Sequence, residues 1–144
     1  MKAADNQGLM EAIVDLEAAC FGETAWTTQQ VAGSLDGEGV VAVAVGPHAY
    51  ALGRLVLDEV ELYRIGVRPT ERRRGLGART LAAFEALAID LGATVMHLEV
   101  RADNAPAIGL YTQRGMIRSG RRAGYYPDGC DALWMSMRLS ASRG

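Results

Sequence analysis

The sequence is poor in the residues that mark disulfide frameworks, metal sites and membrane spans. It has only two cysteines, Cys20 and Cys130, with no CxxC pair and no histidine near them at metal-ligand spacing. Two isolated cysteines favour reduced thiols, and no structural metal is expected. Residues 1–8 lack the apolar core of a signal peptide, and no apolar run approaches the length of a membrane span. We therefore expect a cytoplasmic protein without a membrane partner.

A strong charge of one sign is also absent. The formal net charge is -2, with 22% charged and 49% apolar residues, which is typical of globular domains and argues against general nucleic-acid binding. No linker, repeat or low-complexity segment divides the chain, so residues 1–144 are expected to form one domain with a disordered tail at 140–144. Basic residues nevertheless crowd residues 68–74, which indicates a local anionic ligand.

The hydrophobic pattern predicts an α/β (α+β) domain of about four helices around one sheet. Apolar residues at helical spacing, with capping residues and closing glycines, predict helices near residues 9–21, 28–35, 76–91 and 105–114. Runs of β-branched and apolar residues bounded by turn residues predict strands near residues 40–45, 49–57, 60–67, 94–100, 117–123 and 132–139.

The segment Arg72-Arg73-Arg74-Gly75-Leu76-Gly77 joins a predicted strand to a predicted helix. Such a loop presents unpaired backbone N–H groups at the positive end of the helix dipole, which suits a phosphate group. Glycines let a ligand approach the backbone, and arginines can pair with phosphate charge. The spacing lacks a Walker lysine, and Thr80 stands where a Rossmann fingerprint needs its third glycine. The alternative interpretation is a solvated basic turn that only shapes the helix entry.

Three blocks around this loop share a pattern with a known family. They are Ile65-Gly66-Val67-Arg68-Pro69, the run Leu98-Glu99-Val100-Arg101 that continues to Ile108 and Leu110-Tyr111, and Tyr125-Tyr126-Pro127. Together with the Arg-x-x-Gly-x-Gly loop they resemble the GNAT superfamily of acetyltransferases, and within it the RimI-type N-terminal acetyltransferases. The resemblance runs from Trp26 to Leu139. It implies the acyl-CoA N-acyltransferase fold, a mixed central sheet with diverging central strands. Family members begin with a short strand, which is expected to be frayed or missing here because residues 1–8 show no apolar alternation.

The resemblance also implies acetyl-CoA as cosubstrate, with no metal. Backbone N–H groups of residues 65–67 would stabilise the developing oxyanion if their strand diverges from the strand of Glu99. Asn104 matches a CoA-contacting asparagine of the family, although a helix cap explains it equally well. The implied cofactor-binding residues are Ile65, Gly66, Val67, Arg72, Arg73, Arg74, Gly75, Leu76, Gly77, Ala78 and Asn104.

Two residues are candidates for proton transfer. An α-amine with a pKa near 8 is largely protonated at neutral pH, so acetyl transfer to it needs a base. Glu99 lies on the strand face opposite Leu98 and Val100 and can point into a cleft, although an ordinary strand glutamate fits the same position. The resemblance assigns Glu99 the role of base and Tyr111 that of proton donor to the CoA thiolate. From the residues alone, the favoured interpretation of Tyr111 is a core aromatic on a short helix.

Four further residues are candidates for the acceptor groove. Aromatic side chains can pack a peptide and a carboxylate can attract its ammonium group, although each can equally be plain packing or a surface charge. His97 is left out, since a lone strand histidine is more often structural. The candidates are Trp26, Glu61, Tyr125 and Tyr126.

The function that the resemblance implies is transfer of the acetyl group to a protein N-terminal α-amine, the N-terminal alanine of a small-subunit ribosomal protein, with no nucleic-acid partner. Direct attack without an acyl-enzyme is expected, with Cys20 and Cys130 outside the site. Two alternatives remain open. One is a GNAT acetyltransferase of a small amine or a lysine side chain, and the other is a CoA-binding module without catalysis.

Overall fold

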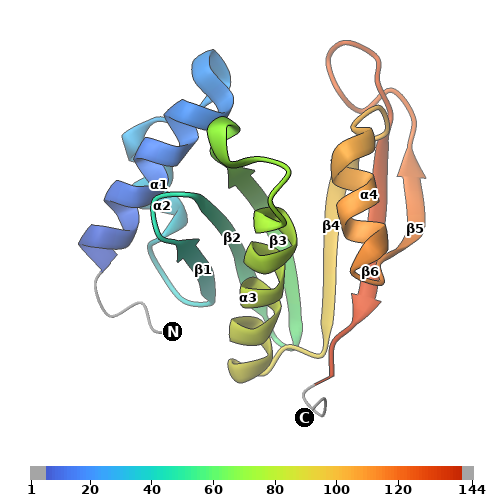
Figure 1. Cartoon of the computed structure of the whole chain (residues 1–144). Coiled ribbons are helices and arrows are strands. Elements are labelled where there is room, and N and C mark those ends of the chain that lie inside the picture. Colours follow the sequence, from blue (N-terminus) through green and yellow to red (C-terminus); the bar gives the residue numbers. More distant parts are fainter. Residues whose placement is uncertain (1–5, 141–144) are drawn as a thin grey trace.

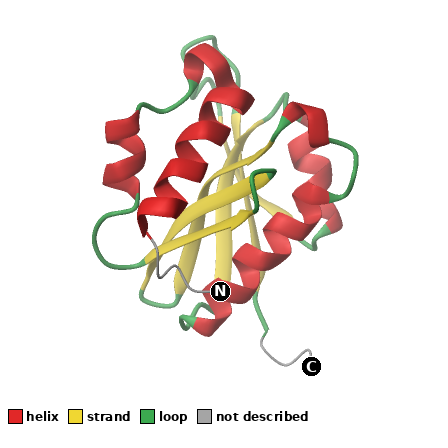
Figure 2. Cartoon of the chain, turned by 60° about the vertical axis from the view of Figure 1, so that its left-hand side comes forward, coloured by secondary structure: helices red, strands yellow, loops and turns green. Residues whose placement is uncertain are grey.

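The computed structural model describes residues 6–140, which form a mixed sheet with helices on both faces (Figures 1 and 2). Six strands are hydrogen-bonded in the order β1-β2-β3-β4-β6-β5. The strands are β1 (Val40–Val45), β2 (Ala49–Val56), β3 (Glu59–Val67), β4 (Val95–Arg101), β5 (Ile117–Arg122) and β6 (Ala132–Arg138). The α-helices are α1 (Asn6–Phe21), α2 (Thr28–Ser34), α3 (Leu76–Asp90) and α4 (Ala105–Gln113), with short 3-10 turns at Gly22–Thr24 and Pro69–Glu71.

Local capping explains where the helices begin. Thr27 and Gln30 form a capping box before α2, in which the Thr27 hydroxyl accepts the Gln30 N–H at 3.1 Å and the Gln30 side chain accepts the Thr27 N–H at 2.8 Å. Asn104 caps α4 by accepting the Ala107 N–H at 3.2 Å, and Pro106 lies in the first turn. The boundaries of the predicted helices and strands are confirmed to within one residue, except that α1 begins three residues before its predicted start at residue 9.

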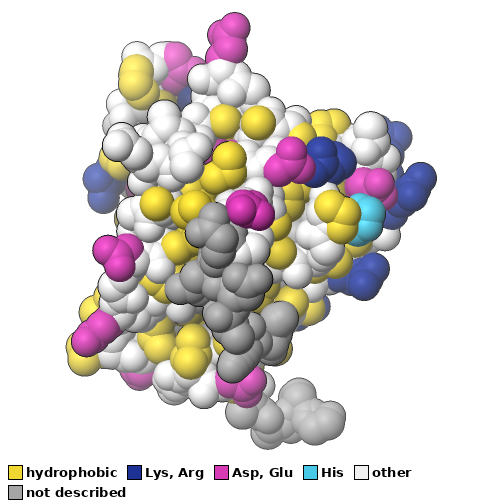
Figure 3. All heavy atoms as spheres, turned by 90° about the vertical axis from the view of Figure 1, so that its left-hand side faces the viewer, with side chains coloured by type: hydrophobic (Ala, Val, Ile, Leu, Met, Phe, Trp, Pro, Cys, Tyr) yellow, Lys and Arg dark blue, Asp and Glu magenta, His cyan; other side chains and the backbone are white. Residues whose placement is uncertain are grey.

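Two hydrophobic clusters lie on opposite faces of the sheet. On one face α3 and α4 cover side chains of β1 to β4 and β6, so that Phe84 of α3 and Leu98 of β4 belong to one cluster. On the other face α1 and α2 cover a smaller cluster that includes Leu16 and Tyr50. Helix α1 packs against β1, β2 and β3. Figure 3 views this side of the molecule, where acidic side chains are spread over the surface and basic ones lie mainly toward one edge.

The central parallel strands separate partway along their length. Pairing between β3 and β4 runs from Glu59 with Val95 to Leu62 with Leu98 and then stops, although β3 continues to Val67 and β4 to Arg101. We call the region between residues 63–67 and residues 99–101 the divergence. It confirms the diverging central strands that the resemblance implied.

Two expectations fall wholly or partly outside the described residues. The additional first strand concerns residues 1–8, of which residues 1–5 are outside the description and α1 begins at Asn6. The tail is described only as far as Ser140. Among residues 6–140, no helix combines the length and apolar character needed to cross a bilayer.

Candidate active site

Several connections meet at the end of the sheet where β3 and β4 separate (Figure 1). They are the α1–α2 connection (residues 22–27), the β3–α3 loop (residues 68–75), the β4–α4 connection (residues 102–104) and the β5–β6 loop (residues 123–131). Ligands of open α/β sheets bind beyond the carboxyl ends of parallel strands, where such connections gather. The predicted site residues lie on these connections or on the elements that they join.

The β3–α3 loop presents free hydrogen-bond donors. Gly75 precedes α3 with φ of 77°, and Arg73 also has a left-handed backbone, with φ of 67°. The Arg72 Nε donates to the Val67 carbonyl at 3.0 Å and so ties the loop to the end of β3. Within residues 6–140, no acceptor contacts the backbone N–H groups of residues 73–78. These donors at a helix N-terminus fit a pyrophosphate group.

Two glycines show how closely other elements pack against the end of β3 and the start of α3. A Cβ at Gly77 would lie 3.4 Å from Leu110 of α4, so α4 packs directly beside the start of α3. A Cβ at Gly66 would lie 2.9 Å from Tyr50 and 3.1 Å from the Cys20 sulfur. No side chain fits at Gly66, which leaves bare backbone within residues 65–67 of β3, the segment predicted to stabilise the oxyanion.

Cys20 therefore lies closer to the candidate site than expected, because its sulfur packs directly against Gly66 of β3. Burial raises the pKa of the Cys20 thiol, and the nearby Arg72 guanidinium offsets part of that rise. A thiol with a raised pKa is a weak nucleophile at neutral pH. The position of Cys20 thus indicates packing and does not favour an acyl-enzyme.

Glu99 lies at the start of the divergence, directly after the last β4 residue that pairs with β3. Its side chain is half-buried, and its Oε2 atom is buried without a hydrogen-bond partner among the described residues. Burial, followed by the nearby Glu99 charge, raises the pKa of Tyr126, which places the β5–β6 loop beside this carboxylate. A buried unpaired carboxylate oxygen is rare in proteins, and here it is available to a ligand or a water.

Tyr111 lies on α4 and is only 6% exposed, within the cluster that α3 and α4 form with the sheet. Burial raises the pKa of its phenol to about 12, so the phenol keeps its proton at neutral pH. Tyr111 follows Leu110, which packs on Gly77. The structure thus confirms the core position and leaves the role of proton donor as a prediction.

The four predicted acceptor residues lie on three elements. Trp26 lies on the α1–α2 connection, and Tyr125 and Tyr126 lie on the β5–β6 loop with their rings edge-on at 5.1 Å. Glu61 lies on β3 opposite His97, one residue before the last pair of the β3–β4 ladder. Trp26, Tyr125 and Tyr126 thus belong to loops at the end of the divergence, whereas Glu61 lies in the paired part of the sheet.

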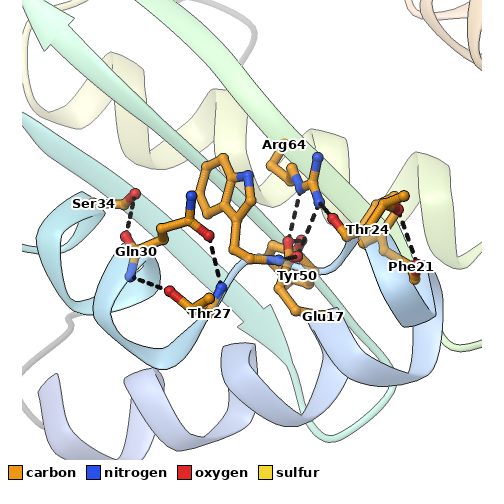
Figure 4. Close-up of polar contacts among 9 residues, drawn as sticks. Glu17, Phe21, Thr24, Thr27, Gln30, Ser34, Tyr50 and Arg64 are labelled. Atoms are coloured by element: carbon orange, nitrogen blue, oxygen red, sulfur yellow. Dashed lines mark hydrogen bonds and ion pairs between the residues drawn. The ribbon is translucent and has the colours of Figure 1, made fainter.

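Sequence reasoning missed a buried polar cluster beside the divergence (Figure 4). The fully buried Glu17 carboxylate accepts hydrogen bonds from the Arg64 Nε at 2.8 Å, from the Trp26 backbone N–H at 2.7 Å and from the Tyr50 hydroxyl. Burial alone would raise the pKa of Glu17, but these donors together lower it below its ordinary value. A signal was present, because Glu17 adjoins Leu16 on the apolar stripe of α1, and a buried charge requires a partner.

A second arginine contacts the opposite loop. Arg101 of β4 pairs with Asp103 at 3.0 Å and with Asp128 of the β5–β6 loop at 2.7 Å. Its guanidinium lies 4.9 Å from the centre of the Tyr126 ring. Sequence reasoning included Arg101 only as part of the resemblance and gave it no role.

The fold and the β3–α3 loop define the class of protein to which this chain belongs. A mixed sheet with diverging central strands and a glycine loop before a long helix is the arrangement of acyl-CoA N-acyltransferases, and a model of the acetyltransferase (GNAT) family matches residues 6–116. The chain belongs to the GNAT family, as the resemblance indicated.

Particular relatives narrow this assignment to the RimI-type branch. The ribosomal protein bS18-alanine N-acetyltransferase of Escherichia coli K12 is 42% identical over 98 residues, which cover 64% of this chain and 64% of that protein. The crystal structure of the ribosomal-protein-S18-alanine N-acetyltransferase from Escherichia coli matches with a TM-score of 0.81 and 31% identity, over 99% of this chain and 92% of that one. The chain therefore spans just under two thirds of the length of the curated relatives that it matches.

A more distant structure shares the fold. NAA60 of Arabidopsis thaliana in complex with acetyl-CoA matches with a TM-score of 0.75 and 16% identity, over 92% of this chain and 94% of that one.

Proposed function

We propose that the protein is a cytoplasmic acetyl-CoA-dependent N-acetyltransferase that modifies a protein N-terminal α-amine, with the N-terminal alanine of a small-subunit ribosomal protein as its acceptor. The observation that carries this proposal is the unpaired, buried Oε2 of Glu99 at the start of the divergence. The relatives named as ribosomal-protein alanine N-acetyltransferases support the choice of acceptor.

The β3–α3 loop supports the choice of acetyl-CoA, which would supply an activated acetyl thioester. The free N–H groups of residues 73–78 would hold its pyrophosphate, and Arg72, Arg73 and Arg74 would pair with the remaining phosphate charge. Beyond Leu62 the β4 side of β3 has no ladder partner, so N–H groups of residues 65–67 on that side are available to a developing oxyanion. Asn104, the cap of α4, lies on the adjacent β4–α4 connection.

Glu99 and Tyr111 would divide the proton transfers. The Glu99 carboxylate would take a proton from the acceptor amine, directly or through one water, because its free oxygen needs a donor. Tyr111 keeps its phenolic proton at neutral pH and would give it to the leaving thiolate. Trp26, Glu61, Tyr125 and Tyr126 would line the approach of the acceptor.

The proposal is tested with acetyl-CoA and a panel of acceptors. The panel contains peptides with an N-terminal alanine, peptides with a blocked N-terminus and an internal lysine, polyamines and aminoglycosides. Transfer to the alanine peptides is expected for the wild type. The isosteric variant Glu99→Gln is expected to lose about 10²- to 10⁴-fold in kcat, the usual contribution of a general base, with little change in acetyl-CoA affinity. Glu59→Gln, which alters another carboxylate of the sheet, is the control.

Other results would favour the alternatives. Transfer only to polyamines or aminoglycosides, or only to internal lysine, would replace the N-terminal acceptor with that substrate. Binding of acetyl-CoA without turnover on any acceptor would favour the non-catalytic module. An activity of Glu99→Gln within about threefold of wild type, far below the effect of removing a general base, would remove Glu99 from the mechanism.

A further inference from the structure

Arg64 occupies a position where the sheet is irregular. The β2–β3 ladder pairs Gly53 with Leu62 but Leu52 with Arg64, so Tyr63 is an extra residue in β3. Leu62 packs on the face covered by α3 and α4. By strand alternation Arg64 would lie on that face too, but the extra residue turns it to the face of α1. The irregularity thus directs an arginine toward α1 two residues beyond the last β3–β4 pair.

The Arg64 guanidinium donates hydrogen bonds and also contacts two aromatic rings. The Nε and Nη2 atoms donate to the two Glu17 carboxylate oxygens at 2.8 and 3.0 Å, and Nη2 also donates to the Thr24 carbonyl at 3.2 Å. The guanidinium carbon lies 4.0 Å from the Phe21 ring centre and 4.8 Å from that of Trp26. A flat guanidinium can make a bidentate carboxylate pair and stack on aromatic rings, which an ammonium group cannot.

These contacts fix the α1–α2 connection at both ends. Phe21 is the last residue of α1, Thr24 lies in the following turn, and Trp26 lies just before the cap of α2. Glu17 holds the Trp26 backbone N–H at 2.7 Å while it pairs with Arg64 (Figure 4). One buried ion pair therefore joins this connection to β3, immediately before the segment 65–67.

We propose that Arg64 is a positioning residue for the acceptor: it holds the α1–α2 connection at the divergence so that Trp26 forms one side of the acceptor groove. This inference rests on the proposed function, because it assumes an acceptor that reaches Glu99 beside the connection. Loss of Arg64 should therefore weaken binding of the acceptor and have little effect on the chemical step or on the binding of acetyl-CoA.

The test compares Arg64→Gln and Arg64→Lys with a matched control, Arg54→Gln. Arg54 of β2 also donates to backbone carbonyls, those of Ser34, Asp36 and Glu38, but these belong to the end of α2 and the turn that follows it. Arg64→Gln is expected to raise the KM for an alanine peptide about tenfold, the order expected from losing hydrogen bonds to a charged group. Values of kcat and of the acetyl-CoA Kd should change less than about threefold, because these variants leave Glu99 and the β3–α3 loop intact. Arg64→Lys should lie between, since it keeps the charge but not the stacking.

A second variant guards against misfolding. Arg64→Gln leaves the buried Glu17 carboxylate without its cation, so its fold is checked by circular dichroism. The double variant Glu17→Gln/Arg64→Gln removes the contact without leaving a buried charge, and it is expected to show the same rise in peptide KM. In a Trp134→Phe background, Trp26 is the single tryptophan, and Arg64→Gln should increase its quenching by acrylamide.

Two results would overturn the inference while the proposed function stands. One is an unchanged peptide KM in folded Arg64→Gln and in the double variant, together with unchanged Trp26 quenching. The other is a parallel loss of peptide and acetyl-CoA affinity, which would mark a general structural role. A wild type that transfers acetyl groups to no peptide would instead overturn the proposed function, and the acceptor role of Arg64 with it.

Discussion

Gly75 is the residue at which the β3–α3 loop enters α3. Its φ of 77° lies in the left-handed region, and a Cβ there would meet nothing within 4 Å. A larger side chain at this position would therefore be opposed by the backbone conformation alone. The neighbouring N–H groups of residues 73–78 depend on that conformation for their direction.

Gly75→Ala is expected to destabilise the protein by about 1–2 kcal/mol, the cost of a left-handed residue that carries a Cβ. It should also weaken acetyl-CoA binding as the loop relaxes. Gly109→Ala is the control, because Gly109 lies inside α4 with open space around it and alanine favours a helix by about 1 kcal/mol. Thermal unfolding and isothermal titration with acetyl-CoA measure both effects. Equal stability of the two variants would contradict the expectation.

The buried Tyr111 phenol should make the free energy of unfolding depend on pH in the alkaline range. Burial raises its pKa to about 12 in the folded protein, against about 10 for an unfolded tyrosine. The stabilisation that the neutral Tyr111 phenol gives the folded state is therefore complete below pH 10. It is lost as the pH rises toward 12, because the unfolded tyrosine ionises first. The difference in unfolding free energy between wild type and Tyr111→Phe should fall by up to about 1.4 kcal/mol per pH unit in this interval. Denaturant unfolding between pH 8 and about 11 measures it, with Tyr63→Phe, which removes an exposed hydroxyl, as control.

Local sequence predicted some site residues and not others, for a physical reason. Gly75 and Asn104 were predictable because a left-handed turn and a helix cap are set by neighbouring residues. Glu17 was read only as part of a helix face, because its partners Tyr50 and Arg64 are 33 and 47 residues away. The assignments of Glu99 and Tyr111 depended on family resemblance, since a strand glutamate and a helix tyrosine carry no local mark of catalysis.

At the scale of elements, the β5–β6 loop is held by charged contacts on both sides. Asp131 accepts the Gly124 N–H at 2.8 Å and the Arg121 Nε at 2.7 Å, while Asp128 pairs with Arg101. Hydrogen bonding to Arg101 lowers the pKa of Asp128. The loop that carries Tyr126 thus depends on Arg101 of β4, much as the α1–α2 connection depends on Arg64 of β3.

Asp128→Asn is expected to raise the peptide KM by about threefold with kcat nearly unchanged, a modest effect because the pair is exposed to solvent. Asp103→Asn is the matched control, since Asp103 pairs with the same arginine but belongs to the β4–α4 connection. Steady-state kinetics with an alanine peptide compare the two variants. Equal effects would show that the charge on Arg101 matters and that its link to the β5–β6 loop does not.

The boundaries of the elements followed from periodicity and capping, but the arrangement of the sheet did not. The extra residue Tyr63 and the end of pairing after Leu62 depend on β2 and β4, which contact β3 only in the folded chain. The pattern of β3 alone reads as one continuous strand. The divergence could be expected from family resemblance alone.

At the scale of the whole molecule, the two predicted proton-transfer residues lie on opposite sides of β4. Leu98 and Val100 face the cluster that contains Tyr111, so Glu99 between them faces the other way. Both residues can reach the same reactants only where β3 and β4 are apart. This arrangement favours direct transfer within a ternary complex.

Direct transfer predicts that neither cysteine carries the acetyl group. The double variant Cys20→Ala/Cys130→Ala should keep kcat within about threefold of wild type, whereas loss of a covalent nucleophile would abolish turnover. Initial rates with both substrates varied should give intersecting double-reciprocal lines for wild type and variant. Parallel lines, or an acetylated cysteine found by mass spectrometry after incubation with acetyl-CoA alone, would contradict direct transfer.

The divergence also has a consequence for how the protein can change over time. The loop proposed for acetyl-CoA contacts β3, α3 and Leu110 of α4, whereas the two connections proposed to flank the acceptor are joined to the central strands by Arg64 of β3 and Arg101 of β4. We therefore expect substitutions in residues 22–27 or 123–131 to alter the choice of amine while the proposed acetyl-CoA site keeps its structure. One scaffold can in this way acquire new acceptors without rebuilding its catalytic centre.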